Sequence, residues 1–516
     1  MTAHNGLPGT DDRSLLRCLQ WALLFIVCVF FHIIGTWSLP LIDRDEPRFA
    51  EASREMIQRG DYVVPYFNDQ LRLDKPPLTY WAQVASYGIF GENDFGARFP
   101  SAVAAALIAV TIPVRGLRIG GERVGWRAAI IFTLCLQTFI HAKAAVADMW
   151  LALFVSTAHW SGLELLRDGL TNTSAYPQNS KRKHEISYWW FLFYISLALG
   201  FLAKGPIAWV PLLTVGCTVF YSPNLQLNRR FKFVRGILLM LAIVALWGIP
   251  ALIRTHGEFL RIGIGRHVIG RSFGAMEGHG WNSLGGYVLL LPFYFVTVFV
   301  SFFPWSVKLP SLLKSLWRRR DNIDNYLFSG VAIIFIIFSL IKTKLPHYIL
   351  PAFAMLSLLL ARHWPEKAAA LSQPAETAAK RGRSMFRTMA VVIAFIWIAI
   401  ALIVPPIVAR FFPAYQLFQE SRASLQPNMQ FASVEFEEPS LVWYFRSRVN
   451  GFLTPLNKSR ASEFMSLAGP RFLVLPTSIT ATTFSNPPQD WEFFTTSGFN
   501  IAKGKQVDLT LVMKSD

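Results

Sequence analysis

The chain has 516 residues, of which 53% are hydrophobic, 14% are aromatic and only 16% are charged. In an ordinary soluble protein about a quarter of the residues are charged. The composition therefore excludes a soluble protein of the usual kind and indicates one that is embedded in a bilayer.

Long hydrophobic windows, nearly all without charged residues, recur from the N-terminus to about residue 410. Each is roughly as long as a helix that crosses the hydrocarbon core, which takes about 17 to 25 residues. They predict an all-α polytopic membrane bundle. Its eleven helices are expected near residues 18–41, 99–114, 128–142, 144–163, 186–203, 205–228, 236–253, 281–304, 325–341, 345–361 and 388–409. The first window lacks an Ala-x-Ala cleavage site, so we expect a retained anchor and not a signal peptide.

Basic residues in the short connections predict the orientation, because Lys and Arg resist translocation. With the N-terminus in the cytoplasm, the cytoplasmic connections are 115–127, 167–183, 229–235, 308–320 and 362–387, and each is rich in Lys or Arg. The other side receives the loops 42–98 and 254–280, short turns near 143, 204 and 342–344, and everything after about 410. Much of the net charge of +18 then belongs to the inner connections, so it does not indicate a nucleic-acid partner.

Two domains are predicted, a membrane domain at 1–411 and an exported domain at 412–516. The tail contains strand-like apolar runs at 471–475 and 507–513, bounded by Pro and Gly. A helix is expected to begin near residue 438, with Ser440 as its cap. These elements predict a small α/β domain. The segments 172–184 and 364–384 are polar and are expected to be mobile cytoplasmic connections.

The first exported loop opens with a dense set of charges at residues 43–48, D-R-D-E-P-R. If Pro47 lies in the first turn of a helix that runs through Glu55, Asp45 and Arg48 share one face. A carboxylate and a guanidinium would then flank one spot, as a site for a charged head group requires. An ion pair that only anchors an interfacial helix is the equally simple interpretation.

Further along the same loop, Lys75 precedes two prolines, which hold the local chain extended. A lysine presented from a rigid turn can bind phosphate, whereas a snorkelling lysine needs no Pro-Pro beside it. At 342–351, K-T-K-L-P-H-Y-I-L-P enters a predicted span. His347 and Tyr348 can bind anionic oxygens there, although an interfacial aromatic and basic belt would look the same.

The loop 254–280 carries Arg261, Arg266, His267 and Arg271 among several glycines. This composition suits a segment that closes over a ligand, and equally a plain connector. Asp148 and Lys204 lie at the exported ends of predicted helices. Ionisable groups near hydrocarbon are functional candidates, with a structural Asp-Lys pair as the competing interpretation.

Taken together, these motifs resemble those of the integral-membrane GT-C glycosyltransferases related to protein O-mannosyltransferases. They are D-E-P-R-F-A-E at 45–51, D-K-P-P-L-T-Y-W at 74–81, the intramembrane Asp148, A-K-G-P at 203–206 and K-L-P-H-Y-I-L-P at 344–351. The sequence is most similar to the bacterial aminoarabinose transferases that modify lipid A. The likeness covers most of the membrane region in order.

The resemblance implies a sugar donor carried on undecaprenyl phosphate, an active site on the periplasmic face of the bacterial inner membrane, and thirteen helices, two more than the windows. It also implies juxtamembrane helices in the first loop. By this analogy the candidate site residues are Asp45 and Asp148 for catalysis, Arg48, Lys75, Tyr348 and His347 for the lipid phosphate, and Asp74, Lys204, His267 and Arg271 for the cavity and its loop.

Several positions depart from the family pattern. Asp74 stands where the family often has Glu, Phe49 replaces a frequent Tyr, and the spacing from His267 to Arg271 is one residue longer. These changes leave the sugar and the acceptor open. The D-x-D at 43–45 is a weak metal signal, and Arg44 and Arg48 would oppose a second positive charge, so we expect metal-independent catalysis. The four cysteines lack the spacing of a disulfide framework or a zinc site.

The sequence therefore predicts an inverting transferase that moves aminoarabinose or a related sugar from undecaprenyl phosphate to lipid A. No further cofactor is expected, and the partners are the donor, the acceptor and membrane lipids, with the chain as a monomer. A protein hydroxyl or another envelope glycan is the alternative acceptor. A transporter or flippase for lipid-linked sugars is the alternative from another class, but it would place polar groups near the middle of the bilayer. A non-catalytic membrane scaffold whose exported tail binds a partner would tolerate loss of Asp45, Arg48 and Lys75.

Overall fold

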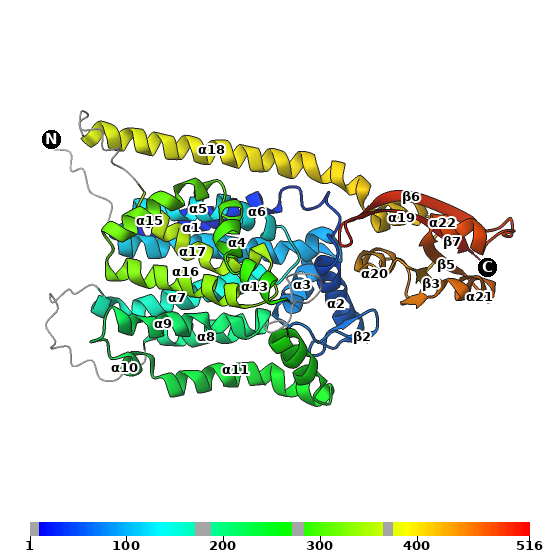
Figure 1. Cartoon of the computed structure of the whole chain (residues 1–516), viewed down its shortest axis with the longest axis horizontal. Helices are drawn as coiled ribbons and strands as arrows, with labels where there is room; N and C mark the ends of the chain where they lie inside the picture. The colour runs from blue at the N-terminus through cyan, green and yellow to red at the C-terminus, as the bar shows by residue number, and fades with distance from the viewer. Residues whose placement is uncertain (1–9, 171–186, 271–282, 365–374, 516) are drawn as a thin grey trace, which may run out of the picture.

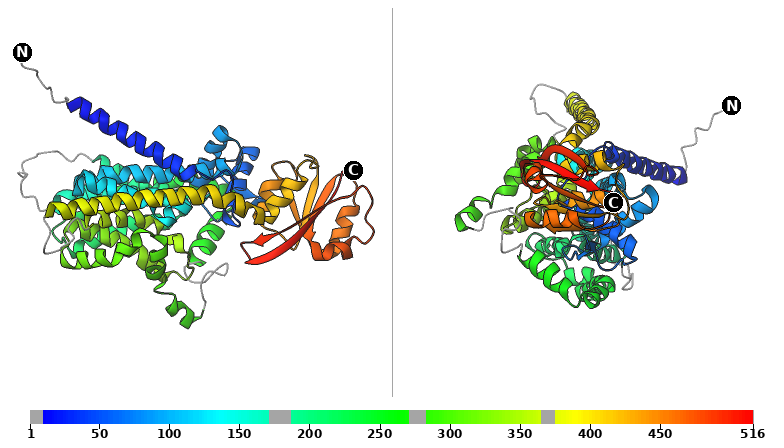
Figure 2. Two further views of the ribbon diagram at one scale, coloured as in Figure 1. Left: turned by 90° about the horizontal axis from the view of Figure 1, so that it is seen from above. Right: turned by 90° about the vertical axis from the view of Figure 1, so that its right-hand side faces the viewer.

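The computed structural model describes residues 10–170, 187–270, 283–364 and 375–515. Its helices form an elongated bundle, and a small β-sheet lies at one end of it (Figure 1). Helix α18 runs along the side of the bundle, from the end that carries α15 to the sheet (Figures 1 and 2).

The membrane region consists of helices and short helical turns. They are α1 (Thr10–Ile33), α4 (Asp94–Gly120), α5 (Glu122–Leu134), α6 (Leu136–His141), α7 (Asp148–Leu170), α8 (Tyr188–Lys204), η1 (Pro206–Trp209), α9 (Val210–Cys217), η2 (Thr218–Phe220), α10 (Leu227–Phe231), α11 (Phe233–Arg254), η3 (Phe259–Gly270), α13 (Leu284–Leu289), α14 (Phe293–Ser301), η4 (Trp305–Lys308), α15 (Leu309–Arg318), α16 (Asn322–Leu340), η5 (Pro346–Ala352), α17 (Phe353–Arg362), α18 (Ala375–Val408) and η6 (Ala409–Phe411). A helical segment therefore falls on each of the eleven predicted windows.

The number of long spans is smaller than predicted. In the described part of the chain, five helices are long and apolar enough to cross a membrane, or six if α14 and α15, which meet at 118°, form one broken span. Three shorter apolar helical segments add to these, and two of them begin at Pro206 and Pro346. Proline interrupts a helix, so a hydrophobic window that predicts one continuous span can correspond to shorter helical segments. Helix α7 lies inside the bundle and carries buried polar groups such as His159, whose Nε2 lies 3.0 Å from Oγ1 of Thr214.

Small residues allow the central helices to approach closely. The alanines of α4 at 102, 104, 105, 106 and 109 are fully buried. A Cβ atom added at Gly116 would lie 2.3 Å from the Cα of Gly125 on α5, so the two backbones are almost in contact there. Such contacts drive helix association in membranes, where apolar burial alone does not.

The first loop folds into two helices and a hairpin, α2 (Asp45–Arg59), β1 (Tyr66–Phe67), β2 (Gln70–Leu71) and α3 (Leu78–Phe90). The predicted helix through Glu55, with Pro47 in its first turn, is confirmed. Asn68 and Asp69 join the two strands with φ angles of 52° and 62°, the left-handed pair that a two-residue hairpin turn needs.

The C-terminal part has a five-stranded sheet in the order β4-β3-β5-β7-β6. Its elements are α19 (Pro413–Ser421), β3 (Gln430–Val434), α20 (Pro439–Phe445), β4 (Leu453–Leu456), η7 (Lys458–Arg460), α21 (Ala461–Ser466), β5 (Arg471–Pro476), α22 (Thr477–Thr483), β6 (Glu492–Asn500) and β7 (Lys505–Lys514). Strand β3 pairs in parallel with β4 and β5, and β7 pairs antiparallel with β5 and β6. The two predicted strands, β5 and β7, are neighbours, with Val474 opposite Leu511.

The continuous apolar sequence of strand β5 reflects burial on both of its faces. Phe472 and Val474 enter the core beneath α19 and α20, whereas Leu473 and Leu475 enter the core beneath α21 and α22. A strand that is covered on both faces reads as a continuous hydrophobic run. The small α/β domain predicted from this run is confirmed. The prediction that Ser440 caps α20 is wrong, because Glu438 occupies the N-cap and the Ser440 hydroxyl donates to Asp43 instead.

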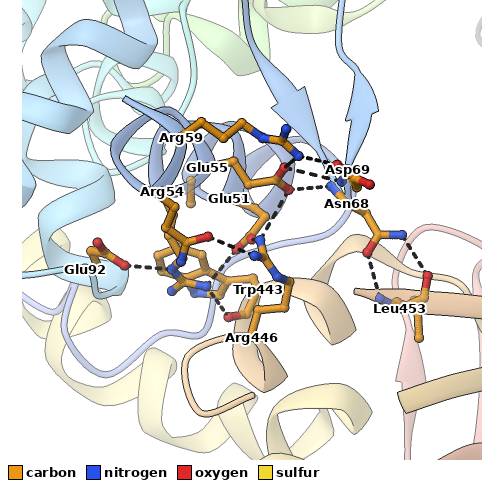
Figure 3. Close-up of polar contacts among 12 residues, drawn as sticks. Glu51, Arg54, Glu55, Arg59, Asn68, Asp69, Glu92, Trp443, Arg446 and Leu453 are labelled. Carbon is orange, nitrogen blue, oxygen red and sulfur yellow. Dashed lines mark hydrogen bonds and ion pairs between the residues drawn. The ribbon is translucent and has the colours of Figure 1, made fainter. Parts of the chain in front are cut away.

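A buried ionic network joins α2 to the C-terminal domain (Figure 3). Arg54 lies 2.7 Å from Glu51, donates to the carbonyl of Trp443 at 2.9 Å, and its guanidinium stacks 3.8 Å above the Trp443 ring. Arg446 on the segment after α20 pairs with both Glu51 and Glu55. All four charged side chains are buried. The C-terminal domain is thus fixed to the helix that begins with the candidate catalytic Asp45.

Candidate functional site

The N-terminus of α2 presents the first acid-base motif. Asp45 is the first residue of the helix and is exposed, whereas the adjacent Glu46 is buried. Glu46 accepts two hydrogen bonds from Arg98, at 2.8 and 2.7 Å, and one from the backbone N–H of Ala145. Glu46 therefore fixes the start of α2 against the bundle, and Asp45 is left facing outward.

The second motif lies close to the first. Arg72 is buried, donates to the Tyr80 hydroxyl at 2.9 Å and pairs with Asp74 at 3.4 Å, and Lys75 lies 3.3 Å from Asp74. The negative charges of Asp74 and Asp45 both raise the pKa of Arg72, against the effect of burial. The guanidinium of Arg72 lies 5.1 Å from the ring centroid of Phe49 on α2, so the segment at 72–75 packs against the helix that begins at Asp45. That Asp45, Arg48 and Lys75 act on one ligand stays a prediction. Sequence reasoning missed Arg72, although it stands only three positions before Lys75.

A third group forms where α7, α8 and η5 meet. Nζ of Lys204 lies 2.5 Å from Oδ1 of Asp148, and Nε2 of His347 lies 3.7 Å from the same oxygen. Lys204 also lies 5.3 Å from the ring centroid of Tyr348. The structure thus brings together four candidate residues from three separate segments. It adds His141 of α6, whose ring is 4.7 Å from that of His347 and which sequence reasoning missed.

Packing places these groups at one end of the bundle. Leu73, beside Arg72, packs with Leu202 and Ala203, which directly precede Lys204. Phe49 of α2 packs with Ala147, which precedes Asp148. The first loop is therefore seated on the ends of α7 and α8, at the end of the bundle that carries the C-terminal domain (Figure 1).

A cavity of about 480 Å³ opens beside the start of α2. Its lining combines the charged residues 43–46, Arg98 and Lys143 with apolar residues, among them Ile34 and residues 400, 401, 404, 405 and 408 of α18. Among the described residues Asp45 lines this cavity, while Arg48, Lys75 and Asp148 do not. A cavity lined by both charged and apolar residues suits a ligand that has a polar head on a lipid chain.

The two carboxylates of the D-x-D motif lie in different surroundings. Asp43 accepts hydrogen bonds from the Ser440 backbone at 2.9 Å and from its hydroxyl at 2.6 Å, whereas Asp45 is exposed at the start of α2. Elsewhere, ligand atoms of His141, Asp148 and His347 lie within 4.8 Å of one another and could hold a metal ion. Lys204 already places a cation on that Asp148 oxygen. Metal-independent catalysis stays a prediction.

Burial raises the pKa of Asp43 to about 7, and the charge of Glu438 adds to this, while the Ser440 hydrogen bonds and Arg48 oppose it. An unfolded chain would release this proton near the ordinary value of 3.8. Between these values the folded state binds more protons than the unfolded state, so stability falls as pH rises.

We therefore expect the contribution of Asp43 to the free energy of unfolding to fall as pH rises from about 4 to about 7. Asp43→Asn should remove this component, because the amide does not titrate. Thermal midpoints of both proteins in detergent, measured across this range, check the prediction. Identical pH dependence in the two proteins would show that folding does not raise the pKa of Asp43.

Two candidates cannot be placed. The side chain of His267 and all of Arg271 lie outside the described residues. The backbone of residues 259–270 forms the π-helix η3, where an irregular loop was predicted. Arg261 on this helix pairs with Glu258 at 2.7 Å.

Comparison with known proteins gives a consistent result. Residues 74–249 match the family described as dolichyl-phosphate-mannose-protein mannosyltransferase. The chain is 30% identical over 353 residues to an undecaprenyl phosphate-alpha-4-amino-4-deoxy-L-arabinose arabinosyl transferase of Sodalis glossinidius, covering 66% of this chain and 58% of that protein. The transferase of Yersinia pestis is also 30% identical, over 68% of this chain and 60% of that protein. The chain thus spans about three fifths of the length of these relatives.

A solved structure shares the fold. The crystal structure of ArnT from Cupriavidus metallidurans bound to undecaprenyl phosphate superposes with a TM-score of 0.71 at 19% identity, over 95% of this chain and 98% of that one. Its apo form gives a TM-score of 0.69. The predicted resemblance to GT-C glycosyltransferases, with aminoarabinose transferases among the similar proteins, is confirmed.

Proposed function

From this similarity we propose that the chain is an inverting glycosyltransferase. It moves 4-amino-4-deoxy-L-arabinose or a related sugar from undecaprenyl phosphate to a phosphate of lipid A. One observation carries the proposal: Asp45 lines a cavity that combines charged residues with apolar residues of α18. Arg72, which pairs with Asp74, packs on Phe49 of the helix that Asp45 begins. The names of the similar proteins support the donor class.

The reaction breaks the bond between the anomeric carbon and an oxygen of the lipid phosphate. The acceptor oxygen attacks that carbon from the opposite face, which inverts its configuration, and the bonding electrons leave with undecaprenyl phosphate. Negative charge grows on the departing phosphate while the sugar becomes oxocarbenium-like. Fixed cations near the phosphate stabilise this transition state more than the ground state.

Some candidate residues stabilise the negative charge on the departing phosphate, and another stabilises the positive charge on the sugar. Arg48 offers a planar fork for two phosphate oxygens and Lys75 adds a compact charge, with His347 and Tyr348 completing the phosphate site. Asp45 supports the positive charge on the sugar. It removes a proton only if the acceptor is a hydroxyl, because a phosphate acceptor attacks as an anion.

We further propose that the chain spans the bacterial inner membrane several times, with the N-terminus in the cytoplasm and the candidate site and the domain 412–516 in the periplasm. The distribution of charge supports this orientation. Helix α15 lies toward the end of the bundle opposite to α2 (Figure 1), and three consecutive arginines stand at its C-terminal end, at 318–320. Positive residues resist translocation, so this end is expected in the cytoplasm.

Mass spectrometry of lipid A tests the function in cells. Cells that produce the chain should contain lipid A with the added mass of one or more sugar residues, and cells without it should not. If lipid A is unchanged while donor is present and the chain is membrane-inserted, lipid A is not the acceptor. Glycosylated proteins or envelope glycans in the same cells would then identify the alternative acceptor. A transporter would move the donor without cleaving it, so free undecaprenyl phosphate would not accumulate.

A further inference from the structure

A second large cavity lies at the end of the bundle opposite to the candidate site. It has a volume of about 1250 Å³ and is formed by α5, α15, the start of α16 and the end of α17. Its charged lining consists of Arg123, Arg127, Lys314, Arg318, Arg319, Arg320, Arg362, Asp321 and Asp324. We call it the arginine pocket. Seven basic side chains face two carboxylates, so the pocket carries an excess of positive charge.

The two carboxylates of the arginine pocket are already neutralised. Arg362 lies 2.7 Å from Asp321 and 2.8 Å from Asp324, and His363 lies 2.9 Å from Asp324. Asp321 also caps α16 by accepting from the backbone of Asp324 at 2.7 Å. Both carboxylates therefore already have basic partners within the pocket.

The remaining cations line the same pocket. Within the residues that the structure describes, Lys314, Arg318, Arg319 and Arg320 form no ion pair with an acidic side chain, and all four are exposed. Orientation in the membrane requires only that basic residues stay on one side, not that they converge on one cavity. Like charges held together repel, so an anionic occupant would stabilise the pocket.

Helix α15 shows which kind of anion fits. It turns by 118° from α14, and Leu309, Leu312 and Leu316 bury one face against the bundle. On the outer face Leu313 is 57% and Trp317 is 89% exposed. Lys314 and Arg318 are one turn apart, directly beside these two residues, and line the pocket. A helix with exposed Trp and Leu next to Lys and Arg is typical of one that lies at a membrane surface.

We propose that the arginine pocket binds the phosphate head group of an anionic phospholipid, in the leaflet opposite to the candidate catalytic site. The phosphate oxygens lie among Lys314 and Arg318 to Arg320, and the acyl chains lie along Leu313 and Trp317. Basic pockets between membrane helices bind anionic head groups in this way. The inference depends on the chain spanning a membrane and not on its sugar donor or acceptor.

Native mass spectrometry of the full chain in detergent tests the proposal, with phosphatidylglycerol and phosphatidylcholine as the probes. We expect phosphatidylglycerol to bind more tightly than phosphatidylcholine, and the double variant Arg318→Gln with Arg319→Gln to weaken that binding by about tenfold or more. The matched control is Arg229→Gln with Arg235→Gln, which removes two exposed arginines near the start of α11. The control should bind phosphatidylglycerol like the wild type.

Three results would overturn the proposal. The first is equal affinity for the two lipids. The second is an equal loss in the pocket variant and in the control, which would reflect net charge alone. The third is displacement of phosphatidylglycerol by inorganic phosphate at equal concentration, which would mean that the pocket takes a soluble anion. A chain that binds phosphatidylglycerol in this manner but transfers no sugar would refute the proposed function and leave the arginine pocket unaffected.

Discussion

Asp45→Asn should lower the turnover of sugar transfer by about 10²- to 10⁴-fold, with little change in folding. The substitution keeps the size of the side chain and removes the charge that supports the oxocarbenium-like sugar. Because Asp45 is exposed and begins α2, its loss leaves no buried group without a partner. The measurement is the initial rate of donor consumption by the purified variant in lipid vesicles.

Asp168→Asn is the matched control, since Asp168 is an exposed aspartate near the C-terminal end of α7. It should retain the wild-type rate. The two variants should also unfold at the wild-type temperature. If Asp45→Asn transferred sugar at more than about a tenth of the wild-type rate, Asp45 would be a helix-terminal residue without a catalytic role, and the interfacial ion-pair interpretation of the motif would stand.

Arg446→Met should be the most destabilising of the substitutions considered. It removes one of the two cationic partners of Glu51 and of Glu55, which are fully buried beneath the C-terminal domain. Complete loss of the partner of a buried charge typically costs about 3 to 5 kcal/mol. Because Glu51 keeps Arg54 and Glu55 keeps Arg59, we expect the free energy of unfolding to fall by up to this amount, measured by thermal or denaturant unfolding in detergent.

Arg448→Met, two residues further on, provides the comparison, because Arg448 is exposed. Its effect should stay within about 0.5 kcal/mol. Since Arg54 still pairs with Glu51 and Glu92 in the Arg446 variant, the network is weakened and not abolished. Equal stability of the two variants would mean that the ionic network of Figure 3 does not fix the C-terminal domain to α2.

The sequence was sufficient for the helical bundle and for the C-terminal strands, because both follow from local patterns. Hydrophobic length predicts helices in a bilayer, and the runs at 471–475 and 507–513 predict strands that are covered by other elements. The number of spans was overestimated because proline interrupts several windows. The helix through Glu55 was predicted from a single proline in its first turn.

Part of the candidate site could not be predicted, because it depends on contacts between distant segments. Arg72 and His141 carry no local signal, and each is held by contacts with other segments. Arg72 contacts Tyr80 and Phe49, and His141 contacts His347. The contact of Ser440 could not be predicted for the same reason. Its hydroxyl does not cap α20 but donates to Asp43, almost 400 positions away in the chain. The segments at 45–48 and 72–75, by contrast, lie in one predicted loop, so the packing of Arg72 on Phe49 joins residues that are close in the chain.

The central claim is that this chain transfers a sugar from undecaprenyl phosphate. The most direct measurement uses the purified chain with synthetic undecaprenyl phosphate-aminoarabinose and lipid A in vesicles, followed by mass spectrometry of both lipids. The account predicts that one free undecaprenyl phosphate appears for each sugar added to lipid A, and that both products are lost with Asp45→Asn. Intact donor after incubation with the folded, membrane-inserted chain, whichever envelope acceptor is supplied, would contradict it.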